Sequence, residues 1–189
     1  MRSKVIFAFL LFSTSLLAQS GLRLRVRNPS ELYAEQRRVV GTWCRQDFDG
    51  LRLAPNGWDR YKPLTNIKSN PDSPSVLIVS RYQIEQHDPS AVSWNLDVTY
   101  FVIGRFERNG GYIPDEFTDT VTFRTKDIDG EIVITDFDPS SPHLSKKSAI
   151  EWMKRELATT TSDVEKLHLT NALKTLDPAA STATAQPAK

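Results

Sequence analysis

The sequence predicts an α+β domain in which a first helix is followed by a strongly curved antiparallel sheet and then by two further helices. Apolar residues recur at helical spacing in residues 30–48 and again in residues 145–177. Between them, four stretches alternate apolar and polar residues, and the links among these stretches are short and rich in turn-forming residues. Consecutive strands with such short links pair antiparallel.

The composition is that of an ordinary globular protein. Of the 189 residues, 39% are hydrophobic and 25% are charged, which suits one domain with a sizeable core. The formal net charge is +1, so no strong field attracts the chain to nucleic acid, and we expect no nucleic-acid partner. Cys44 is the single cysteine, which excludes an internal disulfide.

Residues 1–20 have the layout of a secretory signal peptide. Basic residues at positions 2 and 4 precede an apolar run over residues 5–18, and small residues follow. The run is shorter than the ~20 residues that a membrane-spanning helix needs. We therefore predict cleavage after Ser20 and a secreted or periplasmic mature protein. Three arginines between residues 23 and 27 oppose translocation, so an uncleaved anchor is the alternative.

The first helix is predicted to begin at the Asn-Pro-Ser of residues 28–30 and to stop at Gly50. Asn or Ser can cap the free amides, Pro fits the first turn, and Gly commonly ends a helix. Trp43 and Cys44 fall on the apolar stripe, so we interpret Cys44 as a buried, inert thiol rather than a nucleophile. Residues 54–75 are rich in Pro, Asn, Gly, Asp and Ser and are predicted to form a loop.

The four predicted strands are residues 76–86, 93–107, 117–126 and 131–137. The last two are joined through Asp129-Gly130, which is typical of a hairpin turn. An Asp-x-Asp-Gly stretch here, and another at residues 47–50, resembles a fragment of a calcium loop. Neither has the remaining ligands of an EF-hand, so no metal site is predicted.

Two helices are predicted after the sheet. Ser145 can cap the first, and Ser162 with Glu165 forms a capping box that opens the second. Residues 178–189 lack core-forming side chains and are predicted to be disordered. The predicted organisation is a main domain over residues 28–158, an extra helix over residues 161–177 and a tail.

In detail, this pattern resembles the nuclear transport factor 2-like superfamily, which includes many bacterial SnoaL-like proteins. The resemblance lies in "VVGTWCRQDFDGLRL" with "NGWDRYKPLT", in "LDVTYFVIGRF" with "DTVTFRTKDIDGEIVITDFDP", and in "PHLSKKSAIEWMK". These are a first helix running into a Trp-bearing loop, the central strands, and the segment after the last strand. Together they cover roughly residues 30–154.

The resemblance implies a cone, in which the curved sheet wraps around the first helix and leaves a pocket at its open end. Many members of the family dimerise through the outer sheet face, so the resemblance also implies a homodimer as a partner state. The family contains isomerases, dehydratases, cyclases, hydrolases and non-catalytic binders, and the fold therefore does not choose a function. No catalytic motif of the members resembling ketosteroid isomerase or scytalone dehydratase aligns with this chain.

Three residues are candidates for catalysis. Asp119 and Asp136 are in phase with the apolar residues of their strands, so both are predicted to face the apolar side. An unpaired carboxylate in such a place has a raised pKa, which is one way to make a general base. Tyr100 is phased in the same way and could donate to a ligand. The alternative for Tyr100 is packing in the core. The alternative for the two aspartates is that they lie near strand ends, where they are either hydrated or paired with Arg81 or Arg105.

Four aromatic residues are candidates for ligand binding. Trp58 and Tyr61 lie in the loop before the first strand, where such folds gate their pocket; they either stack on a ligand or plug the opening. Tyr82 and Trp94 are phased with the apolar faces of their strands. For Tyr82, packing in the core is the alternative to ligand contact.

The three histidines do not form a set by spacing, so the sequence predicts neither a metal cluster nor a catalytic triad, and no cofactor. His143 follows the last predicted strand, and we interpret it as a hydrogen-bonding residue at a strand-to-helix junction rather than a catalytic one.

Three functional hypotheses follow. The first is a secreted or periplasmic protein that binds a small apolar molecule in a cone-shaped pocket without chemistry. The second is a cofactor-free isomerase or dehydratase with Asp119 as general base and Tyr100 or Asp136 as donor. The third is a structural or interaction module that dimerises through its outer sheet face.

Overall fold

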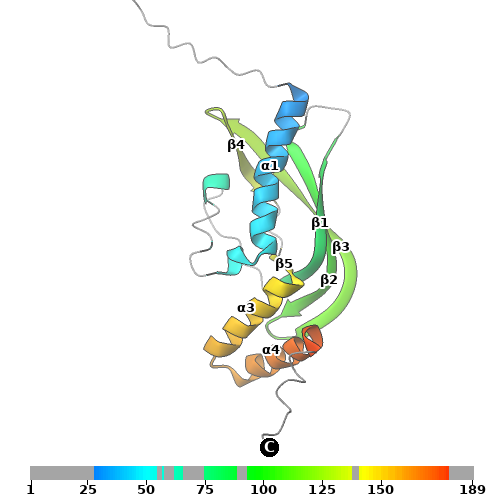
Figure 1. Ribbon diagram of the computed structural model, residues 1–189, viewed down its shortest axis with the longest axis vertical. Coiled ribbons are helices and arrows are strands. Elements are labelled where there is room, and N and C mark those ends of the chain that lie inside the picture. The colour runs from blue at the N-terminus through cyan, green and yellow to red at the C-terminus, as the bar shows by residue number, and fades with distance from the viewer. Residues whose placement is uncertain are drawn as a thin grey trace, which may run out of the picture.

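A computed structural model describes residues 28–54, 57, 62–65, 75–88, 93–137 and 141–178. The predictions for the signal peptide, for Trp58 and Tyr61, and for the tail beyond Pro178 lie outside these residues. The described part is an α+β structure with a curled, half-barrel sheet of five strands and three α-helices (Figure 1). The α+β class predicted from periodicity is therefore confirmed.

The elements follow one another as α1 (Pro29–Phe48), the 3-10 turns η1 (Leu51–Leu53) and η2 (Lys62–Leu64), β1 (Ser75–Gln86), β2 (Asn95–Glu107), β3 (Gly111–Ile128), β4 (Glu131–Phe137), β5 (His143–Ser145), α3 (Lys146–Thr159) and α4 (Asp163–Leu176). The strand order in the sheet is β4-β3-β2-β1-β5. β5 runs parallel to β1, and all other neighbours are antiparallel. Helix α1 lies along the sheet, whereas α3 and α4 lie together at one end of it (Figure 1).

Helix α1 begins and ends where the sequence predicts. The side chain of Asn28 accepts a hydrogen bond from the backbone N–H of Glu31 at 2.8 Å, and Pro29 occupies the first turn. Gly50 has φ 76°, a left-handed conformation that residues with a Cβ adopt at a cost. The chain therefore turns there and leaves the helix axis.

Two features of the sheet differ from the prediction. β3 begins at Gly111 rather than at Phe117, because Pro114 and the acidic residues beside it obscure the alternation. Proline is tolerated there because β4 pairs with β3 only from Phe123 onward, which leaves the first part of β3 with a single described neighbour. The short strand β5 has no period-2 signal and pairs with β1 at Leu77.

Breaks in register explain the curl of the sheet. The β1–β2 pairing shifts on either side of Val79, and the β2–β3 pairing shifts between Val102 and Gly104. Extra residues of this kind bend a strand and increase its local twist. Because the breaks lie at adjacent positions of neighbouring strands, the bend runs across the sheet.

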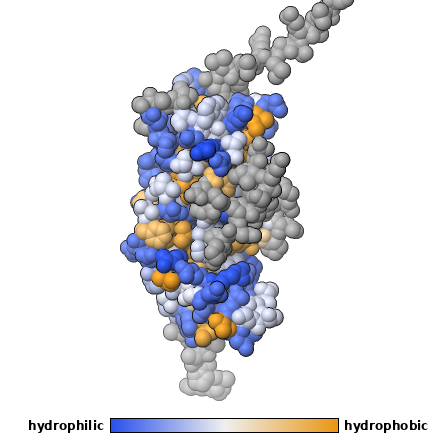
Figure 2. All heavy atoms as spheres, turned by 180° about the vertical axis from the view of Figure 1, so that it is seen from behind, coloured by the Kyte–Doolittle hydropathy of each residue, from blue (hydrophilic) through white to orange (hydrophobic). Residues whose placement is uncertain are grey.

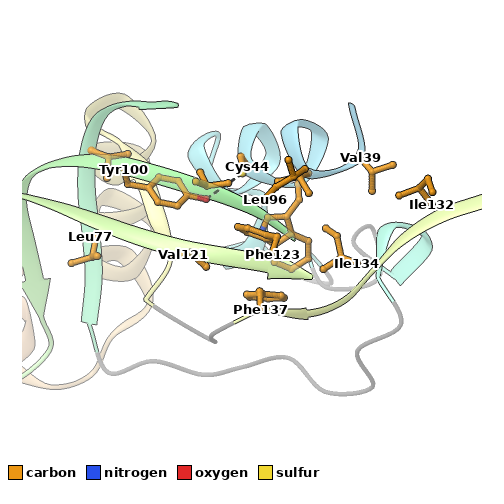
Figure 3. Close-up of a cluster of buried hydrophobic side chains, with 14 of the residues drawn as sticks. Val39, Cys44, Leu77, Leu96, Tyr100, Val121, Phe123, Ile132, Ile134 and Phe137 are labelled. Carbon is orange, nitrogen blue, oxygen red and sulfur yellow. Dashed lines mark hydrogen bonds between the residues drawn. The ribbon is translucent and has the colours of Figure 1, made fainter. Parts of the chain in front are cut away.

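Two hydrophobic clusters cover the sheet. One contains residues of α1 and of strands β1 to β4 (Figure 3). Within it the ring centroid of Trp43 lies 4.9 Å from that of Phe137. The other joins β1, β2 and β5 to α3 and α4. Leu77 belongs to the first cluster and Ile78 to the second, and neighbouring strand residues point to opposite faces. The continuous apolar run at the start of β1 is therefore buried on both sides.

Helix α4 contributes buried residues to the same cluster as α3, so the extra helix predicted after residue 160 packs on the main domain. Seen from behind, hydrophilic residues predominate on the coloured surface, and hydrophobic ones form small separate patches (Figure 2). Within the described ranges, no helix has the length and apolar character needed to cross a membrane.

Candidate functional site

A row of polar-tipped side chains crosses the middle of the sheet. Tyr82 of β1 is paired with Tyr100 of β2, and Tyr100 is paired with Asp119 of β3. Residues directly opposite in adjacent strands project from the same face. The predicted phasing of Tyr100 and Asp119 toward one face is therefore confirmed.

His143 lies over this row. It starts β5, and its ring stacks on that of Tyr100 with centroids 3.7 Å apart and planes 11° from parallel. Its Nε2–H donates to the Oδ2 atom of Asp119 at 2.8 Å. The His143 side chain is 2% exposed and that of Asp119 is 30% exposed. The carboxylate is thus the outward end of a buried pair.

Asp47 holds the other side of the histidine. Its Oδ2 atom accepts the backbone N–H of His143 at 3.0 Å and lies 3.7 Å from the ring Nδ1 atom. The guanidinium of Arg52 is 3.6 Å from the same oxygen, and both side chains are almost completely buried. A carboxylate in the last turn of a helix is disfavoured by the helix dipole, so Arg52 and His143 are needed to stabilise it. Among the described residues, the Oδ1 atom of Asp47 is buried without a hydrogen-bond partner.

These contacts set the charge of His143. Burial of the ring opposes its protonation, but the hydrogen bonds to Asp119 and Asp47 and the charges of these two carboxylates outweigh burial and raise the pKa of His143 above its ordinary 6.5. With the ring protonated, the two cations, His143 and Arg52, balance the two carboxylates. We call these four residues, Asp47, Arg52, His143 and Asp119, the buried charge cluster.

Tyr100 and Cys44 are buried next to the cluster, and the Tyr100 ring stacks on that of His143. The Tyr100 hydroxyl donates to the Cys44 Sγ atom at 3.3 Å (Figure 3). Burial raises the pKa of the thiol to about 12, and burial also raises the pKa of Tyr100 well above its ordinary value. Both groups stay protonated at neutral pH, so the prediction of an inert Cys44 agrees with the structure. Tyr100 is fully buried with its hydroxyl used, so its alternative role in core packing fits better than donation to a ligand.

The expected position of Asp136 is wrong. Its side chain is 58% exposed, and its Oδ2 atom lies 3.0 Å from Nη1 of Arg124. The reason is a register break between Arg124 and Thr125, which pair with Asp136 and Ile134 and leave Thr135 as an extra residue. The extra residue reverses the alternation, so Asp136 turns away from the face that Ile134 shares. The alternative of an ion-paired aspartate holds, with Arg124 as the partner.

The remaining predicted ligand contacts are dispersed. Trp94 is exposed and immediately precedes β2, six residues from Tyr100 and hence about 20 Å away along the chain direction. Tyr82 is half-buried beside Tyr100, with ring centroids 6.0 Å apart, and packs edge-on against Phe48. Tyr82 is therefore next to the cluster, whereas Trp94 is not. Trp58 and Tyr61 lie outside the described residues.

The sequence alone did not predict that His143 and Asp47 belong to one buried charge cluster. Asp47 did carry a signal, because it follows Val40 and Cys44 at helical spacing on the buried stripe of α1. His143 carried none, since the contact that places it is a pairing with Leu77, far away in the chain. His143 does lie where β5 leads into α3, as predicted, but its ring hydrogen-bonds to the Asp119 carboxylate and its backbone N–H donates to Asp47.

The described residues, those of the buried charge cluster included, hold no group of three or more His, Cys, Asp or Glu side chains that could bind a metal ion. No protein-family model, no curated protein and no solved structure matches this chain. The geometry of the buried charge cluster is therefore the basis on which a function is inferred.

Proposed function

We propose that this protein is an exported small-molecule-binding protein of the nuclear transport factor 2-like type, and that it binds an apolar ligand without chemistry. In this proposal the curled sheet is the wall of a cone around α1. The ligand sits on the concave face, where Asp119 reaches solvent. The supports are the half-barrel curvature, the position of α1 along the sheet, and the partly exposed carboxylate at the outward end of a buried charge cluster.

One observation carries the proposal. Phe117 lies two residues from Asp119 in β3, so both project from the same face about 7 Å apart, and Phe117 is 38% exposed. The ring of Phe117 supplies exposed apolar surface. Beside it, Asp119 supplies one polar group, whose orientation is fixed by its hydrogen bond to the buried His143. Small-molecule sites are commonly built in this way.

The proposal predicts binding of a neutral apolar probe at Phe117. Nile red should bind the full chain saturably, with one site and an increase in fluorescence. Phe117→Ala should weaken this binding roughly 5-fold or more, which is about 1 kcal/mol. Leu167→Ala is the matched control, because Leu167 is also an exposed apolar residue but lies on α4. Absence of saturable binding, or an equal loss in both variants, would contradict the proposal.

A second candidate is a cofactor-free isomerase or dehydratase, and the observation that favours it is the 2.8 Å contact between His143 and Asp119. Such a pair can accept and return a proton as a unit. Tyr100 is buried and Asp136 points away, so neither is the donor in this version.

Proton exchange tests the second candidate. α-Tetralone dissolved in D2O with the protein should lose the NMR signal of the protons next to its carbonyl faster than in buffer, and Asp119→Asn should abolish the acceleration. An unchanged rate with saturating protein argues for binding without chemistry, because abstraction of such a proton is the step that this class of enzyme must perform.

A further inference from the structure

We propose that the ligand of this site is a neutral molecule that donates a hydroxyl hydrogen bond to Asp119, such as an alcohol or a phenol on an apolar body, and not a carboxylate, a phosphate or an ammonium compound. This inference rests on the proposed function and specifies the chemistry of the ligand.

Accessibility decides which group a ligand can reach. Asp47, Arg52 and His143 are all buried, and Asp119 alone of the four has a substantially exposed side chain. An ionised carboxylate only accepts hydrogen bonds. A ligand that contacts the cluster therefore has to donate a hydrogen bond, and an anionic group would meet the carboxylate while both cations remain buried behind it.

Charge decides between a neutral donor and a cation. The groups that contact the His143 ring are Asp47 from α1, the neutral Tyr100 from β2 and Asp119 from β3. Behind them, Arg52 from η1 contacts Asp47, and the protonated Cys44 thiol from α1 contacts Tyr100. With His143 protonated, the formal charges of the cluster cancel. An ammonium ligand would add a positive charge beside the imidazolium and would bind well only if His143 released its proton. A hydroxyl group donates to Asp119 without changing the charge.

Spacing defines the rest of the ligand. The apolar surface next to Asp119 on the same face is the exposed ring of Phe117, about 7 Å away. A bicyclic aromatic body spans this distance. The ligand class is therefore a molecule of about that size with a hydroxyl group at one end.

Four probes that share one apolar body test the inference: naphthalene, 2-naphthol, 2-naphthoate and 2-naphthylmethylammonium. Their affinities for the full chain are measured by titration calorimetry at pH 6, where His143 is protonated. We expect 2-naphthol to bind about 10-fold or more tightly than each of the other three, which corresponds to one well-made hydrogen bond to a charged acceptor. In Asp119→Ala this advantage should disappear, while the affinity for naphthalene stays within about 2-fold.

The controls separate the two levels of the proposal. Thr120→Ala changes an exposed neighbour on the opposite face and should leave all four affinities unchanged. If Asp119→Ala does not fold, Asp119→Asn keeps an acceptor without the charge, and it should retain part of the preference for naphthol but lose the exclusion of naphthoate. Tightest binding of a charged probe, or a naphthol preference that survives in Asp119→Ala, overturns the inference alone. If none of the probes nor Nile red binds, the proposed function fails and the inference with it.

Discussion

Replacing Asp47 with alanine is expected to lower the free energy of unfolding by about 3–5 kcal/mol at pH 7. The substitution leaves Arg52 without the carboxylate 3.6 Å away and His143 without the acceptor of its backbone N–H. Both groups are buried, and removing one partner of a buried ion pair is far more destabilising than removing one partner of a surface ion pair. Urea unfolding followed by tryptophan fluorescence measures the difference.

Asp49→Ala is the matched control for this prediction. Asp49 lies two residues further along the chain and is exposed at the end of α1. Its removal should change stability by no more than about 0.5 kcal/mol. Asp47→Asn keeps the shape and an acceptor oxygen, so it should lie between the other two. An Asp47→Ala variant as stable as Asp49→Ala would show that the buried charge cluster contributes nothing to stability.

The second large effect is expected at His143. Replacing it with alanine removes a buried ring stacked on Tyr100 and the partner of Asp119, and it should destabilise the fold by about 3 kcal/mol at pH 6. Because the folded-state pKa of His143 is raised above its ordinary 6.5, the folded state holds this proton more tightly than the unfolded state. The resulting stabilisation is fully present below pH 6.5 and is lost as the pH rises through the folded-state pKa.

The direction of this pH dependence distinguishes the loss of a charged His143 from the loss of its packing alone. Unfolding free energies of the native protein and of His143→Gln are compared from pH 5.5 to pH 9. The difference between them should be largest at the acid end and should shrink as the pH increases. A difference that is constant across this range would mean that His143 contributes through packing alone, and one that grows with pH would reverse the assigned direction of its pKa shift.

Local patterning succeeded where the backbone keeps its regular period. From Asn95 to Val102 the pairing of β2 with β3 is unbroken, so alternation in the sequence correctly predicts that Tyr100 and Asp119 share a face. The same rule failed for Asp136, because a single extra residue at Thr135 reverses the alternation between Ile134 and Asp136. A bulge of this kind depends on the partner strand, and the sequence of β4 alone does not contain it.

The sequence by itself determined the order and type of helices α1, α3 and α4 and of strands β1 to β4, the caps of α1, and the burial of Cys44, since these follow from local spacing and from the chemistry of a few neighbouring residues. The tertiary structure decided the candidate site. Asp47, Asp119 and His143 come from a helix, a strand and a short parallel strand that are far apart in the chain, and their meeting depends on the curl of the sheet and on the pairing of β5 with β1. Periodicity identifies which face a side chain occupies. Contacts between distant segments decide which charged groups are buried together.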